Sequence, residues 1–420
     1  MSLEYETVSL GEHLYIKGRI GWKGLKKDEY LDNGNYRIIN ATALEEDEIN
    51  WDDCGYITKE RFDESPEIIL KEKDILISKD GTIGKLGYVK ELYMPSTVAS
   101  GVFVVRNLNN EYIDTDFLYY YFKSPFFKWF IKSVTEGSVI PHLYQRDFTD
   151  MEFNLFDLDV QKKCSTILNA IEEKININKR INRNLTELSH VLHKEFIKSI
   201  DNNGFCYYKE VKELGTIIMG QSPKGESYNY DNIGLPLING AADYENGYLK
   251  AQKYTTDPKK TCDKNDLIFC IRATIGLLVI CDKEYCLGRG VAGITNIDTL
   301  YKEYAFHLIN SSIENFKRTA TGSVISGISR KDIEEIPVRI LTKDDMKKYH
   351  TIQKPIFDKL ENNRIEIDNL IKLRDTLLPR LMSGEIDVSK INCDMQEIST
   401  NNWDNKFTVP LQNNLIKVIS

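Results

Sequence analysis

Two long stretches of the chain repeat apolar residues at intervals of mostly three and four positions, one from just after residue 159 to about Ile200 and one from about Lys343 to Ser383. This period places the apolar residues on one face of an α-helix. The first face consists of Ile167, Ile171, Ile175, Ile181, Leu185, Leu188, Leu192 and Phe196. The second face consists of Ile356, Leu360, Ile367, Leu370, Leu373, Leu377 and Leu381.

Each predicted helix is longer than a small domain can cover. About 40 residues at 1.5 Å per residue make a helix of roughly 60 Å, which overhangs a globular part of about 150 residues. The length therefore favours an antiparallel pair, a coiled-coil spacer, over two helices that each lie on their own globular part. Asn178 and Asn363 interrupt the two apolar faces, and a polar residue at such a position can fix the register of the pair.

Segments outside the helices occur twice. KDILISKDGTIGKLGYV (73–89) resembles NDLIFCIRATIGLLVI (265–280), 192 positions later, and TEGSVIPHLYQRDF (135–148) resembles ATGSVISGISRKDI (320–333), 185 positions later. The two helices are offset by 189 positions. Matching blocks in one order, at nearly one offset, indicate two copies of a single plan. Each copy is a globular α/β part followed by one long helix.

The predicted fold class is therefore α+β, with two similar α/β domains joined by two long antiparallel helices about an approximate twofold axis. The predicted boundaries are 1–155 for the first domain, 156–202 for the central helix, 203–342 for the second domain, 343–384 for the distal helix and 385–420 for a C-terminal tail. The tail is rich in asparagine and includes a late apolar stretch, LIKVIS.

The segment KDGTIGKLG (79–87) has the glycines and lysine of a phosphate-binding loop. A phosphate loop needs a hydroxyl residue directly after the lysine, but Leu86 follows Lys85 here. The second copy reads RATIGL (272–277) and lacks both the first glycine and the lysine. We interpret the segment as a strand that leads into a tight turn, in which Gly84 and Gly276 serve the backbone geometry.

Composition sets the broad class. The 420 residues are 41% hydrophobic and 28% charged, as in ordinary globular proteins. We expect a cytoplasmic location and no membrane partner, because no apolar run approaches roughly 20 residues and the N-terminus lacks the blocks of a secretion signal. Cys262, Cys270, Cys281 and Cys286 share a 25-residue window without any C-x-x-C pair, which favours buried reduced thiols over a metal site.

Charge and aromatic content leave nucleic acid open as a partner. The net charge is −8, but residues 250–290 hold eight Lys and Arg against five Asp and Glu, and binding needs only a local basic surface. The aromatic run DFLYYYFKSPFFKWF (116–130) could stack on bases. We favour a buried aromatic helix, because the counterpart YAFHLINSSIENF (304–316) keeps less of the aromatic content.

Several motifs together resemble the specificity subunit of a type I restriction–modification system. They are LLPRLMSGEIDV (377–388), Leu214-Gly215 followed by Gly220-Gln221-Ser222-Pro223, KEKDILISKDGTIGK (71–85) with its second copy, and the pairs Gly137-Ser138 and Gly322-Ser323. The resemblance covers about residues 5–388.

This resemblance implies a role without catalysis. Each globular part would be a target recognition domain that reads one half of a split, asymmetric site in double-stranded DNA. The helices would set the gap between the half-sites and dock two modification subunits, through which restriction subunits join. The chain itself would need no cofactor or metal; S-adenosylmethionine, ATP and Mg would belong to its partners.

Lysine, arginine and hydroxyl groups contact phosphates, and bidentate side chains read bases. On that basis we predict DNA contacts from Lys23, Lys79, Lys85, Ser138, Tyr144 and Arg146 in the first domain, and from Gln221, Lys224, Arg272, Arg289, Ser323 and Arg330 in the second. For each of these residues a solvated surface role remains open. His142 has no histidine at the matching position and stays undecided between a reader and an exposed residue.

Two other classes of protein compete with this interpretation. A fused modification enzyme would need an N-P-P-[YFW]-like segment, and the chain has no Pro-Pro pair. The net charge of −8 fits a non-catalytic scaffold or a DNA-mimicking inhibitor of a restriction complex. A mimic should carry acidic residues along one face rather than turn glycines beside lysine and arginine.

Overall fold

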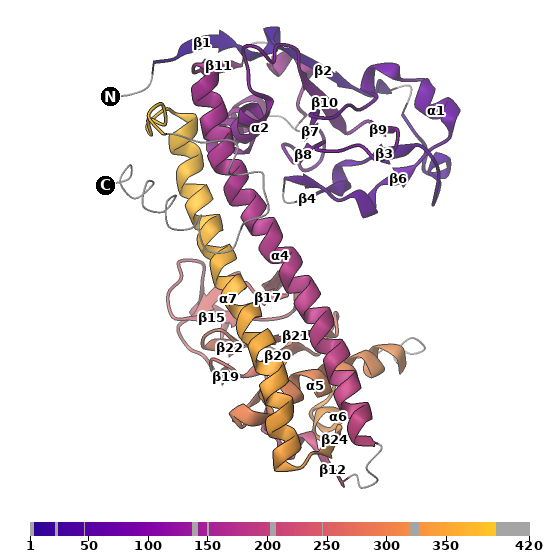
Figure 1. Ribbon diagram of the computed structural model, residues 1–420, viewed down its shortest axis with the longest axis vertical. Coiled ribbons are helices and arrows are strands. Elements are labelled where there is room, and N and C mark those ends of the chain that lie inside the picture. Colours follow the sequence, from indigo (N-terminus) through magenta and orange to yellow (C-terminus); the bar gives the residue numbers. More distant parts are fainter. Residues whose placement is uncertain are drawn as a thin grey trace. The chain divides into compact units, whose positions relative to one another are not determined.

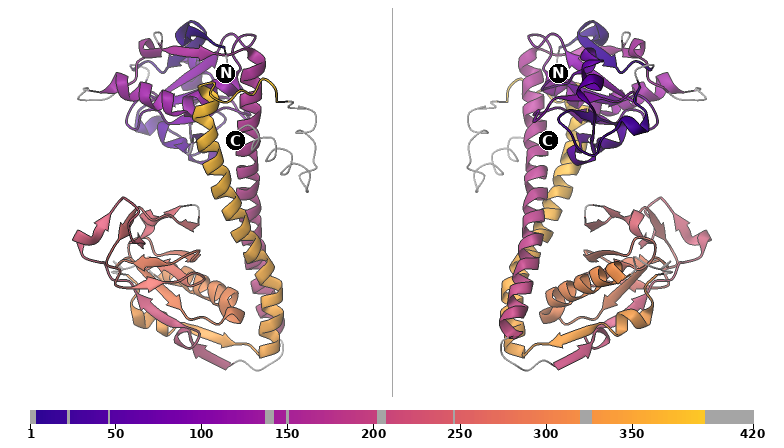
Figure 2. Two further views of the ribbon diagram at one scale, coloured as in Figure 1. Left: turned by 90° about the vertical axis from the view of Figure 1, so that its left-hand side faces the viewer. Right: turned by 90° about the vertical axis from the view of Figure 1, so that its right-hand side faces the viewer.

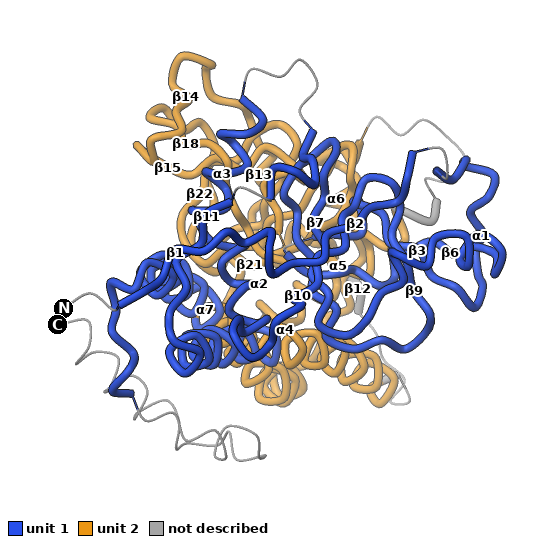
Figure 3. Tube along the Cα trace, turned by 90° about the horizontal axis from the view of Figure 1, so that it is seen from above, with its two compact units in different colours: residues 1–177, 366–420 blue, residues 178–365 orange. Residues whose placement is uncertain are grey.

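The computed structural model describes residues 4–21, 24–45, 47–136, 142–148, 151–201, 207–245, 247–319 and 327–391. The chain forms two compact units (Figures 1 and 3). Unit 1 consists of Met1–Ile177 with Glu366–Ser420, and unit 2 consists of Asn178–Ile365. The boundary between the units crosses both long helices, so each unit contains part of each helix.

Unit 1 is built on an antiparallel sheet in the order β2-β10-β7-β8. Its strands are β2 (Leu14–Gly18), β10 (Val102–Asn107), β7 (Ile75–Ser78) and β8 (Leu86–Tyr88). Side chains alternate between two cores because successive residues of a strand point to opposite faces. Ile75 and Ile77 pack toward helix α2 (Thr115–Lys123), and Leu76 packs into the core on the other face.

A smaller sheet, β6 (Gly55–Tyr56), β3 (Arg37–Ile39) and β9 (Ser96–Val98), contributes to that second core. The remaining helices and strands of unit 1 are β1 (Glu6–Ser9), which pairs with β11 (Glu152–Leu155), the hairpin β4 (Leu44–Glu45) and β5 (Glu48–Ile49), α1 (Lys59–Asp63) and α3 (Pro125–Thr135).

Unit 2 repeats this plan, as the sequence repeat predicted. Its antiparallel sheet has the order β13-β23-β20-β21, with strands β13 (Thr216–Met219), β23 (Val291–Thr295), β20 (Leu267–Cys270) and β21 (Gly276–Ile280). Leu267 and Phe269 pack toward helix α5 (Lys302–Thr319), and Ile268 faces the opposite core.

The second sheet of unit 2 has the order β14 (Tyr228–Asn229), β18 (Lys253–Thr255), β15 (Leu235–Ile238), β22 (Tyr285–Leu287) and β19 (Thr261–Cys262). The remaining elements are β12 (Tyr207–Glu210), which pairs with β24 (Pro337–Ile340), the hairpin β16 (Tyr244–Glu245) and β17 (Tyr248–Leu249), and α6 (Arg330–Glu334).

The two predicted long helices are α4 (Leu158–Asp201) and α7 (Lys343–Met382), and α7 is unbroken at Pro355. They lie side by side in both units (Figure 2). In unit 1, Arg374 Nη1 lies 3.2 Å from Glu172 Oε1. In unit 2, Asn363 Nδ2 donates to Asn182 Oδ1 at 2.8 Å. The Ser189 hydroxyl, farther along α4, donates to Gln353 at 2.6 Å. Partners descend on α7 as they ascend on α4, so the helices are antiparallel as predicted.

The predicted apolar faces are confirmed in unit 1, where both helices enter the core. The buried members there are Ile167, Ile171, Ile175, Ile367, Leu377 and Leu381. Ile181, Leu185, Leu192, Leu360 and Leu370 are half-buried. Leu188 is a wrong assignment, since it is 47% exposed. The neighbouring Ser189, which is 2% exposed, faces α7 instead. In unit 2 the surface of α4 that faces α7 carries hydrogen-bonding side chains, and Ser189 donates to Gln353 there.

The two predicted polar interruptions, Asn178 and Asn363, are both buried, each 1% exposed. Asn363 forms its hydrogen bond with Asn182 on α4, a third buried asparagine that the prediction did not name. Asn182 also donates toward the Leu360 carbonyl, although at 3.5 Å. A buried amide that loses its partner costs roughly 1–3 kcal/mol, so this pairing disfavours any sliding of the two helices.

The aromatic run is two helices rather than one, because Ser124 ends α2 and Pro125 starts α3. Tyr119 to Phe122 are buried on α2, as predicted. The prediction of a buried helix fails on α3, where Trp129 is 72% exposed and Phe126 is 40% exposed.

The turn interpretation of KDGTIGKLG is confirmed. The strand β7 leads into a turn in which Gly81 and Gly84 have φ values of 66° and 84°. The second copy places Ala273 at a φ of 57° and Gly276 at 114°. A left-handed backbone suits glycine, whereas it costs an L-residue roughly 1 kcal/mol.

We expect Ala273→Gly to raise the free energy of unfolding by about 1 kcal/mol, because it removes a side chain from a left-handed backbone position. We expect Gly81→Ala to lower the free energy of unfolding by about the same amount, because it adds a side chain at such a position. Urea denaturation measures both. Gly101→Ala is the matched control, since its φ is not left-handed and an added Cβ would lie 3.8 Å from its nearest neighbour, Asp80. Equal effects at all three positions would contradict this account.

Four of the six histidines gather in unit 2 on α4, α5 and α7: His190, His193, His307 and His350. His307 is 1% exposed, and its Nε2 lies 2.8 Å from the Ser189 hydroxyl. Burial, followed by the neighbouring His190 and Lys194, lowers the pKa of His193 to about 4. Burial also lowers the pKa of His307 to about 2.

These pKa values predict acid sensitivity. Each folded value lies below the ordinary 6.5, so the contribution to stability is complete above pH 6.5 and is lost as the pH falls toward 4. His193 alone should contribute about 2–3 kcal/mol to that loss. Thermal unfolding from pH 7 to 4 should therefore show a shallower pH dependence for His193→Gln than for the unsubstituted chain. Identical slopes would count against this role for His193.

Candidate nucleic-acid interface

Three loops meet at the end of strand β7 in unit 1: residues 79–84, 99–101 and 142–146. The Leu143 amide donates to the Lys79 carbonyl at 3.1 Å, and the Lys79 amide donates to the Gly101 carbonyl at 2.9 Å. We call this surface and its counterpart in unit 2 the loop edge.

The loop edge of unit 1 brings several predicted site residues together. Tyr144 is 49% exposed, and the Arg146 guanidinium lies 4.9 Å from the centre of its ring. The centre of the His142 ring lies 4.5 Å from that of the Tyr144 ring, and His142 pairs through Nδ1 with the Asp80 carboxylate. This pairing gives His142 a defined role in holding the two loops together.

Lys79 lies deeper in the loop edge and is half-buried, with its ammonium 4.9 Å from the centre of the Phe103 ring. Burial lowers its pKa, and the nearby Asp80 carboxylate acts in the opposite direction. A partly desolvated cation gains more from an incoming phosphate than a fully hydrated one, because less water has to be displaced.

Unit 2 forms the same loop edge from residues 271–276, 288–290 and 327–330. The Ile328 amide donates to the Ile271 carbonyl at 2.9 Å, and the Ile271 amide donates to the Gly290 carbonyl at 2.9 Å. These bonds match those of unit 1 at the offsets of the sequence repeat. The side chains differ, since Arg272 stands where unit 1 has Asp80.

The predicted residues of unit 2 line this edge. Arg272 and Arg289 are exposed, and Arg289 Nε lies 3.2 Å from the Ser222 hydroxyl. Gln221 is exposed, and its amide donates to the Leu287 carbonyl at 2.8 Å, which fixes the Gln221 backbone beside the 288–290 loop.

Other predicted residues are engaged or lie elsewhere. The half-buried Lys85 reaches toward the Ala41 carbonyl at 3.5 Å. Lys224 lies 3.8 Å from Glu226. Arg330 bonds to Glu334 on α6 at 2.7 Å. Lys23, Ser138 and Ser323 lie outside the described residues, as do Gly137, Gly322 and the tail beyond residue 391.

Helix α3 is a part of the surface that sequence reasoning missed. Its exposed face carries Trp129, with Lys128 and Lys132 next to each other on one side of it. Its inner face contacts the loop edge, because a Cβ at Gly84 would lie 2.5 Å from the Ile131 side chain. The signal was present in the helical period, which places Trp129 opposite the buried Phe127 and both lysines on the flank between them.

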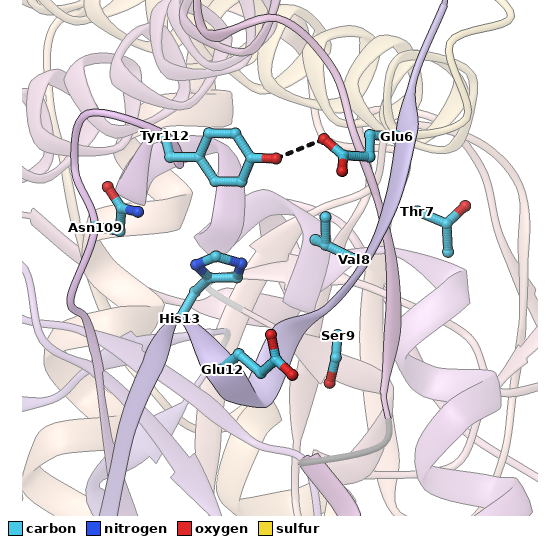
Figure 4. A pocket seen from close by; sticks show the side chains of 8 residues that line it. All are labelled: Glu6, Thr7, Val8, Ser9, Glu12, His13, Asn109 and Tyr112. Carbon is cyan, nitrogen blue, oxygen red and sulfur yellow. Dashed lines mark hydrogen bonds between the residues drawn. The ribbon is translucent and has the colours of Figure 1, made fainter.

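A separate open hollow of about 510 Å³ lies on unit 1 beside strand β1 (Figure 4). It is lined by Glu6, Thr7, Val8, Ser9, Glu12, His13, Asn109 and Tyr112. The Tyr112 hydroxyl donates to the Glu6 carboxylate at 2.6 Å. Two carboxylates in this lining disfavour a phosphate backbone, so the hollow is not part of the interface.

The cysteine window of unit 2 is buried, as predicted, and burial raises the pKa of Cys270 to about 11. Among the described residues, no group of three or more His, Cys, Asp or Glu side chains is arranged to hold a metal ion. Within the same part of the chain, no helix is long and apolar enough to cross a membrane.

Comparisons with known proteins agree with the repeat. The MjaX specificity subunit attributed to a type I restriction enzyme of Methanocaldococcus jannaschii is 27% identical over 397 residues, which cover 87% of this chain and 90% of the relative. The type I restriction enzyme MjaIX specificity subunit of the same organism is 24% identical, over 77% and 82% of the two chains.

The crystal structure of the type I restriction–modification system S subunit from M. genitalium matches the fold with a TM-score of 0.59 and 14% identity. The match covers 90% of this chain and 96% of that chain. The family model for the type I restriction modification DNA specificity domain matches residues 3–187 and again residues 207–373. The two matches span most of the chain and follow its internal repeat. The chain therefore belongs to the family of type I restriction–modification DNA specificity proteins.

Proposed function

We propose that this chain reads DNA sequence for a type I restriction–modification complex and that each loop edge reads one half of a split site. The observation that carries this proposal is the pair of loop edges, which share their backbone hydrogen bonds and differ in their side chains. A shared backbone arrangement that carries different side chains suits the recognition of two half-sites of different sequence. Within one duplex, a protein with approximate twofold symmetry meets two half-sites in opposite orientations.

The helix pair suits the role of spacer. A rigid antiparallel pair would convert helix length into base pairs between the half-sites, since one DNA turn is about 34 Å. We propose that exposed faces of α4 and α7 dock two modification subunits and that restriction subunits join through these. S-adenosylmethionine, ATP and Mg would be used by those partners, in the cytoplasm. The exposed arginines on the loop edges count against a DNA-mimicking inhibitor, which the net charge of −8 alone would fit.

The assembled complex of this chain with its modification subunit should bind duplex DNA with an affinity that falls steeply as salt rises. Arg146→Gln and Arg272→Gln should each weaken binding and reduce the salt slope by about one, because each removes one phosphate contact. Titration of labelled duplex at several salt concentrations measures this. Lys209→Gln is the control, an exposed lysine that pairs with Glu213. An equal loss of slope in the control would overturn the assignment.

Lengthening the helix pair should lengthen the gap and leave both half-sites unchanged. One heptad inserted after residue 178 and one before residue 367, which lies opposite it on α7, adds about 10 Å, or roughly three base pairs. A seven-residue insertion preserves the seam on both sides. Mapping methylated DNA from cells that carry each version measures the gap. If the half-site sequences change instead, the proposed division between reading loops and spacer is wrong.

A further inference from the structure

Each unit carries a short hairpin outside the loop edge, β4–β5 in unit 1 and β16–β17 in unit 2. Both follow a single turn of 3₁₀ helix, at Ala41–Ala43 and Ala241–Asp243. The hydrogen bond from the Asn50 amide to the Ala43 carbonyl in unit 1 corresponds to the bond from Lys250 to Asp243 in unit 2. The hairpins are therefore one element present twice, and their sequences share too few residues to show it.

In unit 2 the hairpin is bonded to both helices. The Asn182 side chain on α4 donates to the Tyr248 hydroxyl at 2.8 Å. The Arg364 guanidinium on α7 lies 5.9 Å from the centre of the Tyr248 ring, and its Nη2 is 3.4 Å from the Asp282 carboxylate. Asn182 is 7% exposed and the Arg364 side chain is 15% exposed, so water competes weakly for these bonds.

In unit 1 the corresponding hairpin meets α4. The Asn176 side chain donates to the Glu48 carboxylate at 3.2 Å. The Lys123 ammonium lies 2.8 Å from Glu172 on α4 and 3.9 Å from Asp47 in the hairpin turn. The Lys123 side chain is 7% exposed. The buried Lys123–Glu172 pair fixes the ammonium beside α4, and the hairpin meets this group through Asp47 and meets α4 itself through Glu48.

These contacts are directional, whereas apolar packing is not. A hydrogen bond or ion pair weakens steeply when its partners rotate or slide, and an apolar contact tolerates small displacements. A sheet domain held to a helix by such bonds keeps one orientation. The contacts in the two units also come from matching elements, so the arrangement is part of the repeated plan.

We propose that the two hairpins are braces, each of which fixes the angle between a reading domain and the helices of its own unit. The gap accepted between half-sites then depends on the braces as well as on helix length. This inference rests on the proposed reading of a split site, and it assigns Asn176, Asn182, Tyr248 and Arg364 as positioning residues.

The experiment uses the assembled complex once its split site has been mapped. Binding is compared for duplexes with both half-sites intact and a gap that is native, one base pair shorter or one base pair longer. Tyr248→Ala should reduce the preference for the native gap about fivefold, the equivalent of a lost hydrogen bond with its cation–π contact. Tyr248→Phe should lose less, because the ring over Arg364 remains. Glu245→Gln is the control on the same hairpin, at an exposed residue that pairs with Lys250.

Asn176→Ala tests the brace of unit 1 independently and should also relax the gap preference. If Tyr248→Ala prevents assembly, Tyr248→Phe and Asn176→Ala decide the question alone. Gap preferences equal to that of the unsubstituted complex in both variants would overturn the braces and leave the reading function intact. A complex without any split site would instead refute the proposed function. Changed half-site sequences in a brace variant would place these residues in readout rather than in positioning.

Discussion

Where the two long helices meet in unit 2, they bury amide and hydroxyl groups, and each of these groups needs a partner. Asn182 faces Asn363, and Ser189 faces Gln353. A slip by one helical turn would separate both pairs at a cost of roughly 1–3 kcal/mol for each group left unpaired. A seam made only of leucine would resist such a slip less, because apolar contacts are not directional. Any distance between half-sites that these helices set depends on the register that these polar pairs fix.

In the repeated plan, the backbone that positions the loops is independent of the side chains that would contact DNA. In both units, main-chain hydrogen bonds hold three loops together, and these bonds do not depend on side-chain identity. The side chains on those loops can therefore change without changing the loop positions. Asp80 in one copy and Arg272 in the other differ in charge at matching places. A protein that must recognise two unlike sequences with one architecture needs this independence.

The sequence was sufficient for the repeat, the long helices and the turn after β7, because each depends on local periodicity or on a glycine pattern. The sequence did not predict the features that depend on contacts with other parts of the chain. Leu188 has the spacing of a seam residue, but histidine and glutamine from other elements select Ser189 instead. Trp129 looked like core, but Pro125 starts a new helix that turns it outward. The repeated hairpin was missed because ALEEDEI and DYENGYL have one backbone path and few residues in common.

The core of unit 1 includes Ile367, Leu377 and Leu381, which come from the far end of the chain. During synthesis, the first sheet therefore emerges from the ribosome long before the residues that complete its core. The core of unit 1 is therefore completed late in synthesis. Its apolar surface stays uncovered until more than 200 further residues have been added. Contacts so distant in sequence fold slowly. A chain cut short before α7 would thus lose both units rather than only the second.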